Sequence, residues 1–199
     1  ILDYGCGQGA LTIFLAKMGV EVIGIDISDE ALIQAQKQAC EAGITENISF
    51  IKMDAQNLKF NDSSFDLVCG ISIIHHLNPE RSYSEISRVL KPTGRAIFLE
   101  LLGHNVFINL FRRCTPKFRS SGEQPLHVGD IYQAKRYFDK IDCEWFSLVT
   151  LMAIPFVKTF LREPLLIFSE KLDNVIIRNH PYVGKYGWQV IIQLERPYK

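Results

Sequence analysis

Apolar and polar positions follow two periods along the first hundred residues. Short apolar runs, typical of buried strands, alternate with stretches in which apolar side chains recur every three to four positions, as in helices. The predicted strands cover residues 1–4, 21–27, 48–53, 65–71 and 95–101, and the predicted helices cover residues 10–18, 29–42 and 79–90. Strands separated by helices of this length indicate right-handed βαβ units. The pattern therefore predicts a doubly wound, Rossmann-like α/β fold with three layers, in which a parallel sheet is covered on both faces.

The pattern changes after residue 101. Helical spacing recurs at residues 105–114, 130–138 and 156–177, the last with a break at Pro164, and residues 115–129 form a loop rich in Pro, Ser and Gly. Two further strands, 143–151 and 188–194, are expected to form an antiparallel hairpin that completes a seven-stranded sheet. We expect a single domain over residues 1–199, in which residues 103–186 form a cap insertion over the site. Because the chain opens inside an apolar strand and without Met, we also expect an N-terminal segment to precede it.

Composition and charge narrow the class of protein. The chain has 199 residues, 47% of them hydrophobic and 22% charged, which fits a globular domain with a core and not a disordered chain. The formal net charge is zero, which disfavours a dedicated nucleic-acid-binding protein. Residues 1–103 have a formal net charge of −5, and residues 104–199 have a formal net charge of +5. The two halves are therefore expected to have different functions, unless composition simply drifts along the chain.

The cysteines and the length of the apolar runs indicate a compartment. Five cysteines occur without any Cys-x-x-Cys spacing, and their number is odd, which favours reduced thiols over a disulfide scaffold. No apolar run approaches the length of about 20 residues that a membrane-spanning helix needs. The sequence therefore predicts a cytoplasmic protein.

The first chemical signal is the segment Asp3-Tyr4-Gly5-Cys6-Gly7-Gln8-Gly9, between the first strand and the first helix. Glycines there allow a tight turn and a close approach of a ligand to the backbone, and the helix N-terminus behind them attracts a carboxylate or a phosphate. The spacing Gly5-x-Gly7-x-x-Ala10 also fits a dinucleotide fingerprint. The charge of Asp3 argues against a pyrophosphate and favours a cationic amino acid group, and no second phosphate-binding glycine loop follows.

Five motifs in this order carry a resemblance to a known family. They are the glycine segment, Val22-Ile23-Gly24-Ile25-Asp26, Asp54-Ala55, Phe65-Asp66-Leu67-Val68-Cys69-Gly70 and Leu90-Lys91-Pro92-Thr93-Gly94-Arg95. Over residues 1–101 the chain resembles the class I S-adenosylmethionine-dependent methyltransferases, in particular the ubiquinone and menaquinone methyltransferases and the type called methyltransferase domain 11.

The resemblance implies a cofactor site for S-adenosylmethionine, with S-adenosylhomocysteine as product and no metal. Asp26 is placed at the ribose hydroxyls and Asp54 near the adenine amino group. The cofactor-binding residues that it implies are Asp3, Gly5, Cys6, Gly7, Gly9, Asp26, Ile27, Asp54, Ala55 and Gly70. The alternatives are structural: Asp26 as a surface acid that opens a helix, Asp54 as the cap of the following turn, and Asp3 as an anchor of the glycine segment.

Three histidines are candidate catalytic bases. His75 and His76 follow the fourth strand, and the resemblance puts them beside the methyl donor, while His104 follows the fifth strand. A histidine can take a proton from an attacking hydroxyl. The alternative for His75 and His76 is packing or a hydrogen bond in the core, and for His104 a bond to the local backbone. A base is needed only for a hydroxyl or an acidic carbon, since a neutral amine attacks unaided.

The sequence thus predicts an enzyme that transfers a methyl group by direct SN2 displacement to a small, apolar or amphipathic molecule. Two alternatives remain open: a binding protein of the same fold without catalysis, and an NAD(P)-dependent oxidoreductase. A nucleic-acid acceptor is disfavoured, because the run Gly70-Ile71-Ser72-Ile73 replaces the motif of amino-group DNA methyltransferases. The basic cluster Arg112-Arg113-x-x-x-Lys117-x-Arg119 is either a solvated helix end or a contact to an anionic group or membrane surface, and the oligomeric state is not predicted.

Overall fold

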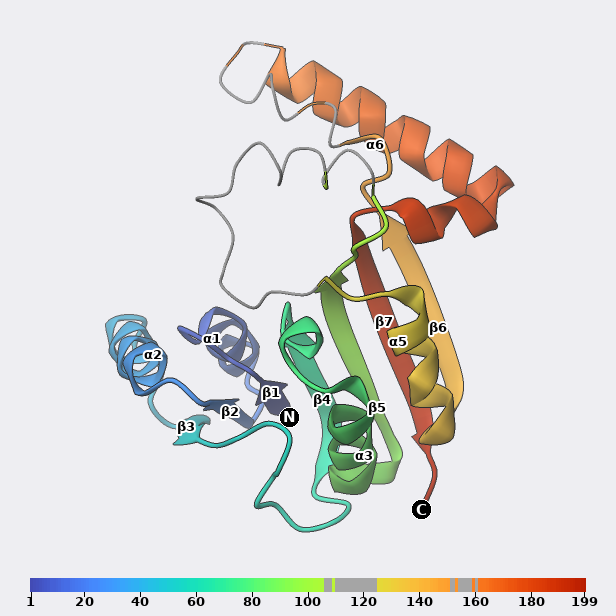
Figure 1. Ribbon diagram of the computed structural model, residues 1–199. Coiled ribbons are helices and arrows are strands. Elements are labelled where there is room, and N and C mark those ends of the chain that lie inside the picture. The colour runs from blue at the N-terminus through green and yellow to red at the C-terminus, as the bar shows by residue number, and fades with distance from the viewer. Residues whose placement is uncertain (106–108, 110–124, 151–152, 154–158, 160) are drawn as a thin grey trace.

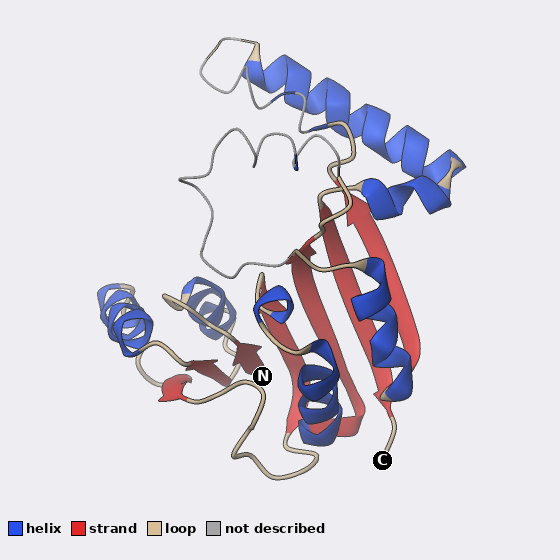
Figure 2. Cartoon of the chain, viewed as in Figure 1, coloured by secondary structure: helices blue, strands red, loops and turns tan. Residues whose placement is uncertain are grey.

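A seven-stranded sheet forms the centre of the computed structural model, with the strand order β3-β2-β1-β4-β5-β7-β6 (Figures 1 and 2). The structure describes residues 1–105, 109, 125–150, 153, 159 and 161–199. The strands are β1 (Leu2–Tyr4), β2 (Val22–Asp26), β3 (Ile48–Lys52), β4 (Phe65–Ile71), β5 (Leu90–Leu101), β6 (Phe138–Phe146) and β7 (Gln189–Pro197). The predicted doubly wound fold is confirmed.

The strand directions confirm the prediction of five parallel strands and an antiparallel hairpin. Strands β1 to β5 are parallel to their neighbours, and β7 is antiparallel to both β5 and β6. Consequently β6 runs in the same direction as β5, and β7 alone runs against the sheet. The strand predicted at residues 143–151 begins earlier, at Phe138, because the pairing with β7 extends over Phe138–Phe146.

The helices cover both faces of the sheet. They are α1 (Ala10–Lys17), α2 (Asp29–Glu41), α3 (Pro79–Val89), α5 (Val128–Gln133) and α6 (Arg162–Asn179), together with short 3-10 turns at Ile74–His76, Ala134–Arg136 and Pro181–Tyr186. Figure 1 shows α3 and α5 in front of β4 to β6. Helix α1 lies on the opposite face, because its Thr12 contacts Asp3, whose side chain alternates with those of Leu2 and Tyr4 along β1.

The sequence also gives the reasons for the helix ends. Ser28 caps α2 by accepting from the Ala31 N–H, and Asn78 caps α3, with Pro79 in the first turn. Pro164 was predicted to break a helix, but it lies in the first turn of α6, where its missing N–H costs no hydrogen bond. The helix predicted at residues 105–114 and the basic cluster at residues 112–119 lie outside the described residues.

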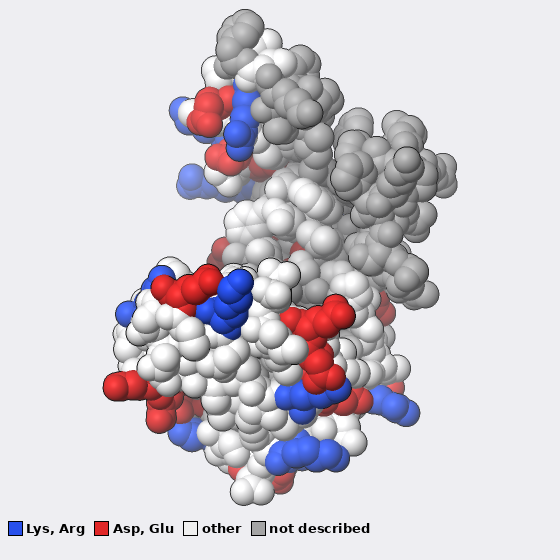
Figure 3. All heavy atoms as spheres, turned by 90° about the vertical axis from the view of Figure 1, so that its left-hand side faces the viewer, with Lys and Arg blue, Asp and Glu red and all other residues white. Residues whose placement is uncertain are grey.

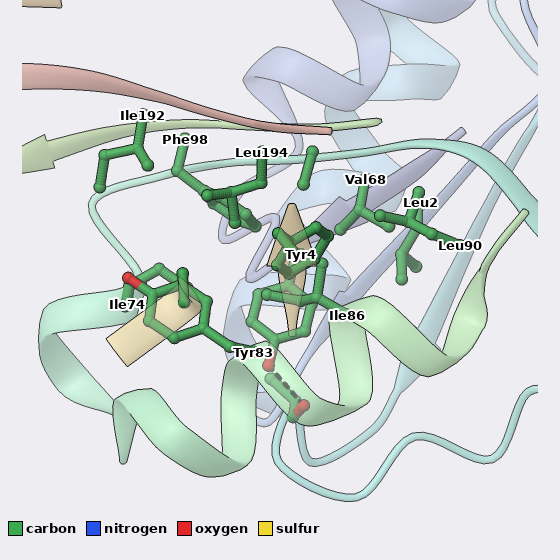
Figure 4. Packing of buried hydrophobic residues seen from close by; sticks show 14 of the residues in the cluster. Leu2, Tyr4, Val68, Ile74, Tyr83, Ile86, Leu90, Phe98, Ile192 and Leu194 are labelled. Atoms are coloured by element: carbon green, nitrogen blue, oxygen red, sulfur yellow. Dashed lines mark hydrogen bonds between the residues drawn. The ribbon is translucent and has the colours of Figure 1, made fainter. Parts of the chain in front are cut away.

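The main core lies between the sheet and α3 and α5. Figure 4 shows Leu2, Tyr4, Val68, Phe98, Ile192 and Leu194 of the strands packed against Ile74, Tyr83 and Ile86. Glu100 of β5 follows the same alternation as Phe98 and Leu102 and is 0% exposed, so it is a carboxylate placed among apolar side chains. The core therefore extends to the carboxyl ends of β4 and β5, where ligands bind in open α/β sheets.

Candidate active site

The glycine segment forms a tight loop between β1 and α1. Its glycines have left-handed backbones, with φ of 77° at Gly5, 52° at Gly7 and 82° at Gly9. The loop is tied to β2, because the N–H groups of Gly5 and Cys6 donate to the Ile25 carbonyl at 3.0 and 2.8 Å. Side chains other than glycine rarely adopt such backbone angles, so the local sequence determines the path of this loop.

The surroundings of the three glycines differ. A Cβ atom at Gly5 would lie 2.5 Å from the Ile73 side chain, and one at Gly9 would lie 2.9 Å from Ala35 Cβ. A Cβ atom at Gly7 would meet nothing within 4 Å. Gly5 and Gly9 are therefore required by packing, whereas Gly7 borders open space in which a ligand can approach the backbone. This arrangement fits the amino acid end of S-adenosylmethionine.

Asp3 is buried behind the loop, only 1% exposed. Its Oδ2 accepts a hydrogen bond of 2.6 Å from Thr12 Oγ1. Burial raises the pKa of the Asp3 carboxyl to about 6, although the bond from Thr12 acts in the opposite direction. Asp3 thus anchors α1, which agrees with the structural interpretation of this residue and leaves its contact to a ligand a prediction.

Cys6 presents its backbone and not a reactive thiol. Burial raises the pKa of its thiol to about 12, and the charges of Asp3 and Asp26 act in the same direction. A protonated thiol is a poor nucleophile. The contact of Cys6 to a cofactor stays a prediction.

Asp26 ends β2 beside the loop. Its Oδ2 accepts from the Gly7 N–H and its Oδ1 from the Ser28 N–H, both at 2.9 Å. Each carboxylate oxygen can accept a second hydrogen bond, so both oxygens can still accept from vicinal hydroxyl groups. The side chain is half-buried, and the next residue, Ile27, is 69% exposed.

Asp54 and Ala55 follow β3. Asp54 is exposed, and its Oδ1 accepts from the Gln56 N–H at 2.8 Å, so it caps the following turn as the structural alternative states. The Ala55 carbonyl accepts a 2.6 Å hydrogen bond from the hydroxyl of Tyr4, which joins this turn to β1. Both residues therefore lie at the same edge of the sheet as the glycine loop, where their cofactor contacts stay predictions.

The turn after β4 is the third part of the site. A Cβ atom at Gly70 would lie 2.7 Å from the Tyr4 carbonyl oxygen, so only glycine fits between β4 and β1 there. Ser72 has a φ of 56° and donates its N–H to the Leu99 carbonyl at 2.7 Å. Glu100 accepts from the N–H groups of Ile73 and Ile74 at 2.9 and 2.7 Å. These contacts fix the turn that carries His75 and His76.

The two histidines of this turn have different environments. The His75 side chain is only 2% exposed, and its Nδ1 lies 2.7 Å from Glu100 Oε2. His76 is exposed, and its ring centroid lies 4.1 Å from that of His75. His75 therefore has the hydrogen bond in the core that the structural alternative describes, with a carboxylate as its partner.

His104 lies near the carboxyl end of β5 and is partly buried. Its Nε2 accepts from the Val128 N–H at 3.2 Å, and its ring contacts that of His127 at 4.8 Å between centroids. Burial lowers the pKa of His104, and the neighbouring His127 and Lys185 lower it further. The imidazole thus bonds to local backbone, as the structural alternative states, and the lone pair of Nε2 is already used.

The sequence interpretation missed Thr12, Ile73 and Glu100. For Glu100 a signal existed, because it is the one charged residue in the apolar run from Ala96 to Leu102. For Thr12 and Ile73 no local signal marks the contact, since each partner lies in another element. Within the described ranges, no group of three or more His, Cys, Asp or Glu side chains is arranged to hold a metal ion, and Cys6, Cys40, Cys69 and Cys143 are free thiols.

Known proteins share this arrangement. The methyltransferase domain family matches residues 2–98. Norajmaline N-methyltransferase of Rauvolfia serpentina is 36% identical over 108 residues, which are 53% of this chain and 37% of that protein. Ubiquinone biosynthesis O-methyltransferase of Paraburkholderia phymatum is 33% identical over 112 residues, 56% of this chain and 47% of that protein. The matches thus span less than half the length of these curated relatives.

Solved structures extend the likeness in fold over the whole chain. A protein of Pyrococcus horikoshii OT3 has a TM-score of 0.69 at 23% identity and covers 98% of this chain and 80% of its own. Phosphoethanolamine N-methyltransferase 2 of Haemonchus contortus, solved with S-adenosyl-L-methionine, has a TM-score of 0.69 at 20% identity and covers 99% of this chain and 48% of its own. Over residues 2–98 the chain thus matches the methyltransferase domain family, and a solved structure of the same fold, named a methyltransferase, contains S-adenosyl-L-methionine.

Proposed function

We propose that the protein transfers a methyl group from S-adenosylmethionine to a small, apolar or amphipathic molecule. The observation that carries the proposal is the open space at Gly7 beside the two carboxylate oxygens of Asp26, both with a remaining lone pair. When bound, the cofactor supplies an activated methyl group. The protein then contributes mainly position and alignment, which can account for roughly 7–11 kcal/mol of the barrier.

Each predicted residue has a defined task in this proposal. The loop from Gly5 to Gly9 binds the amino acid end of the cofactor, and the negative charge of Asp3 attracts its ammonium group. Asp26 accepts from the ribose hydroxyls, with Ile27 beside them. Asp54 and Ala55 border the adenine, and Gly70 leaves room at the end of β4.

The acceptor is proposed to bind at the carboxyl end of β5. A cavity of about 440 Å³ lies there, and its lining combines apolar side chains (Leu99, Trp145, Phe146, Ile177 and Ile191) with the acids Glu170 and Asp173 of α6. This lining supports an amphipathic acceptor. The names of curated relatives include norajmaline, sterol and ubiquinone biosynthesis methyltransferases, which supports small molecules as the class.

The cap is proposed to be smaller than residues 103–186. Within that range, β6 and α5 belong to the sheet and to the layer that covers it. Helix α6 and the 3-10 turn Pro181–Tyr186 are the described elements of the proposed cap, which Figure 1 shows beyond the carboxyl end of β5.

The surface and the helices bear on the remaining predictions. Basic and acidic side chains are interspersed on the side of the molecule that Figure 3 shows, which supports a small molecule over a nucleic acid as partner. No described helix has both the length and the apolarity to cross a bilayer. We keep a cytoplasmic location as a proposal, and peripheral membrane contact is a prediction that depends on the basic cluster at residues 112–119.

Calorimetric titration of the chain with S-adenosylhomocysteine and with NAD tests the cofactor. We expect S-adenosylhomocysteine to bind and NAD not to bind. Asp26→Ala should weaken the binding by about 10- to 100-fold, because a hydrogen bond to a charged group is worth about 1.5–3 kcal/mol. Asp29→Ala is the matched control: it removes an exposed carboxylate, paired with Lys52, from the start of α2 and should bind as the wild type does.

The other outcomes separate the alternatives. Binding of NAD instead would support an oxidoreductase. Binding of S-adenosylhomocysteine without methyl transfer from labelled S-adenosylmethionine to any member of a panel of hydroxyl, carbon and amine acceptors would support a binding protein. A folded chain that binds neither ligand contradicts the proposal.

A further inference from the structure

Glu100 is a fully buried carboxylate outside the glycine loop. It is 0% exposed and lies between Phe98 and Leu102 on the apolar face of β5. Burying a carboxylate is costly unless hydrogen bonds replace those that it makes to water. Its partners therefore indicate what the fold gains from it.

All the hydrogen bonds given for this carboxylate come from the turn after β4. Oε1 accepts from the N–H groups of Ile73 and Ile74, and Oε2 lies 2.7 Å from His75 Nδ1. Ser72, which precedes these residues, has a left-handed backbone with a φ of 56°. A strained backbone of this kind persists where its surroundings hold it, and Glu100 holds three consecutive residues of the turn.

The first of these residues reaches the glycine loop. A Cβ atom at Gly5 would lie 2.5 Å from the Ile73 side chain, and a Cβ atom at Gly70 would lie 2.9 Å from it. The Ile73 side chain thus packs between the glycine loop and the end of β4. Glu100 accepts from the N–H of Ile73, so the carboxylate determines the position of the Ile73 side chain beside the proposed cofactor site.

The third residue held by Glu100 is His75, whose Nδ1 is hydrogen-bonded to the carboxylate. A carboxylate accepts hydrogen bonds, so we assign the hydrogen between His75 and Glu100 to Nδ1. The neutral imidazole then has its lone pair on Nε2, and no donor among the described residues reaches that atom. In contrast, the Nε2 lone pair of His104 already accepts from Val128.

We propose that Glu100 is a positioning residue for methyl transfer: it fixes the tautomer of His75 with Nε2 as the proton acceptor, and it holds Ile73 against the glycine loop. The inference rests on the proposed function. During transfer to a hydroxyl, the acceptor oxygen forms the bond to the methyl carbon while the carbon–sulfur bond breaks and its electron pair stays on sulfur. The proton of the hydroxyl passes to Nε2, and the resulting imidazolium remains paired with the carboxylate of Glu100.

Nuclear magnetic resonance of the imidazole nitrogens in the full chain tests the tautomer without any acceptor. The His75 signals are identified by their loss in His75→Asn. We expect the neutral ring of the wild type to carry its hydrogen on Nδ1. In Glu100→Gln the amide oxygen still accepts from Ile73 and Ile74 while the amide nitrogen donates to Nδ1, so the hydrogen should move to Nε2.

Binding of S-adenosylhomocysteine tests whether Glu100 positions Ile73 against the glycine loop. Glu100→Gln should bind within about threefold of the wild type, whereas Glu100→Ala, which leaves two buried N–H groups without an acceptor, should bind at least about tenfold more weakly. Glu85→Gln is the control, since Glu85 is also an acid that accepts from a backbone N–H, that of Leu58, but it belongs to α3. It should alter neither the tautomer nor the affinity.

The outcomes distinguish the two proposals. A hydrogen on Nε2 in the wild type, or a tautomer that does not respond to Glu100→Gln, overturns the role of Glu100. Equal affinity in Glu100→Ala and the wild type overturns its link to the glycine loop. A wild type that does not bind S-adenosylhomocysteine overturns the proposed function, whereas the tautomer of His75 still reports whether Glu100 positions the ring.

Discussion

The glycine-loop region, residues 1–101, and the C-terminal region, residues 125–199, are held together in different ways. In the first, strands pair in sequence order around β1, and the loop follows from the backbone angles of three glycines. The second has no left-handed glycine among its described residues, and side chains that bond to distant backbone hold it, as Glu100 also does in the first. Asp173 of α6 accepts from the N–H groups of Leu148, Val149 and Thr150, and Asn105 donates to the Tyr186 carbonyl at 2.9 Å.

This difference follows from what each region has to bind. A cofactor site that is built from backbone must satisfy strict local conformations, and these require particular residue types at fixed spacing. A region that shapes an acceptor site has no such fixed demand, so distant side-chain contacts can hold it. The family match at residues 2–98 falls in the glycine-loop region.

The largest expected effect comes from breaking the C-terminal region alone. Asp173→Ala leaves three N–H groups and the hydroxyl of Thr150 without their acceptor. Disruption of such a buried charged network costs about 3–5 kcal/mol. Hydrogen exchange followed by mass spectrometry should show faster exchange at residues 145–150 and in α6, with β1 to β3 unchanged. Equal acceleration in β1 to β3, or lost affinity for S-adenosylhomocysteine, would show that the regions are not separable.

The same contrast explains how much of the fold could be predicted from the sequence. Strand β4 and the caps of α2 and α3 were predictable, because Ser28, Asn78 and Pro79 mark them locally. The start of β6 was not, since pairing with β7 determines it and not its own pattern. The helix predicted from residue 130 begins earlier, at Val128, and Asp130 lies inside it and accepts from the N–H of His127.

The site was predictable to a similar degree. Gly5, Gly7, Gly9 and Asp26 lie together where the motif places them. The role of Glu100 was not predictable, because it depends on a turn 25 or more residues earlier in the chain. His104 was the preferred base in sequence, but its bond to Val128 depends on the return of the chain at α5, which no local pattern marks.

Two glycine substitutions should destabilise the first region by less than Asp173→Ala destabilises the second. Gly9→Ala strains a left-handed backbone and places its Cβ atom 2.9 Å from Ala35 Cβ, which cannot rotate away. We expect it to lower the free energy of unfolding by about 3 kcal/mol. Gly7→Ala carries the backbone strain without a contact, so about 1 kcal/mol is expected. Urea unfolding measures both, and equal losses would show that packing around Gly9 contributes nothing.

An effect smaller than that of Asp173→Ala is expected in the pH dependence of the first region, through Asp3. Its pKa is raised by burial from 3.8 to about 6, so between these values the folded state binds more protons than the unfolded state. Stability therefore falls as the pH rises through this window, and the loss, about 2–3 kcal/mol, is complete above about pH 6. Asp3→Asn keeps an acceptor for Thr12 and removes the titration.

Urea unfolding of the wild type and Asp3→Asn between about pH 4 and pH 7 measures this difference. We expect the variant to be more stable by about 2 kcal/mol at neutral pH, with the gain vanishing toward pH 4. The same variant should bind S-adenosylhomocysteine more weakly, because it lacks the charge that attracts the ammonium group. The exposed Asp29→Asn should show neither effect. A constant difference across the window would mean that Asp3 does not titrate there, whereas a gain in stability without a loss of affinity would reduce Asp3 to an anchor of α1. The glycine-loop region thus carries a buried acid whose ionisation is destabilising, whereas Asp173 of the C-terminal region accepts from three backbone N–H groups and a hydroxyl.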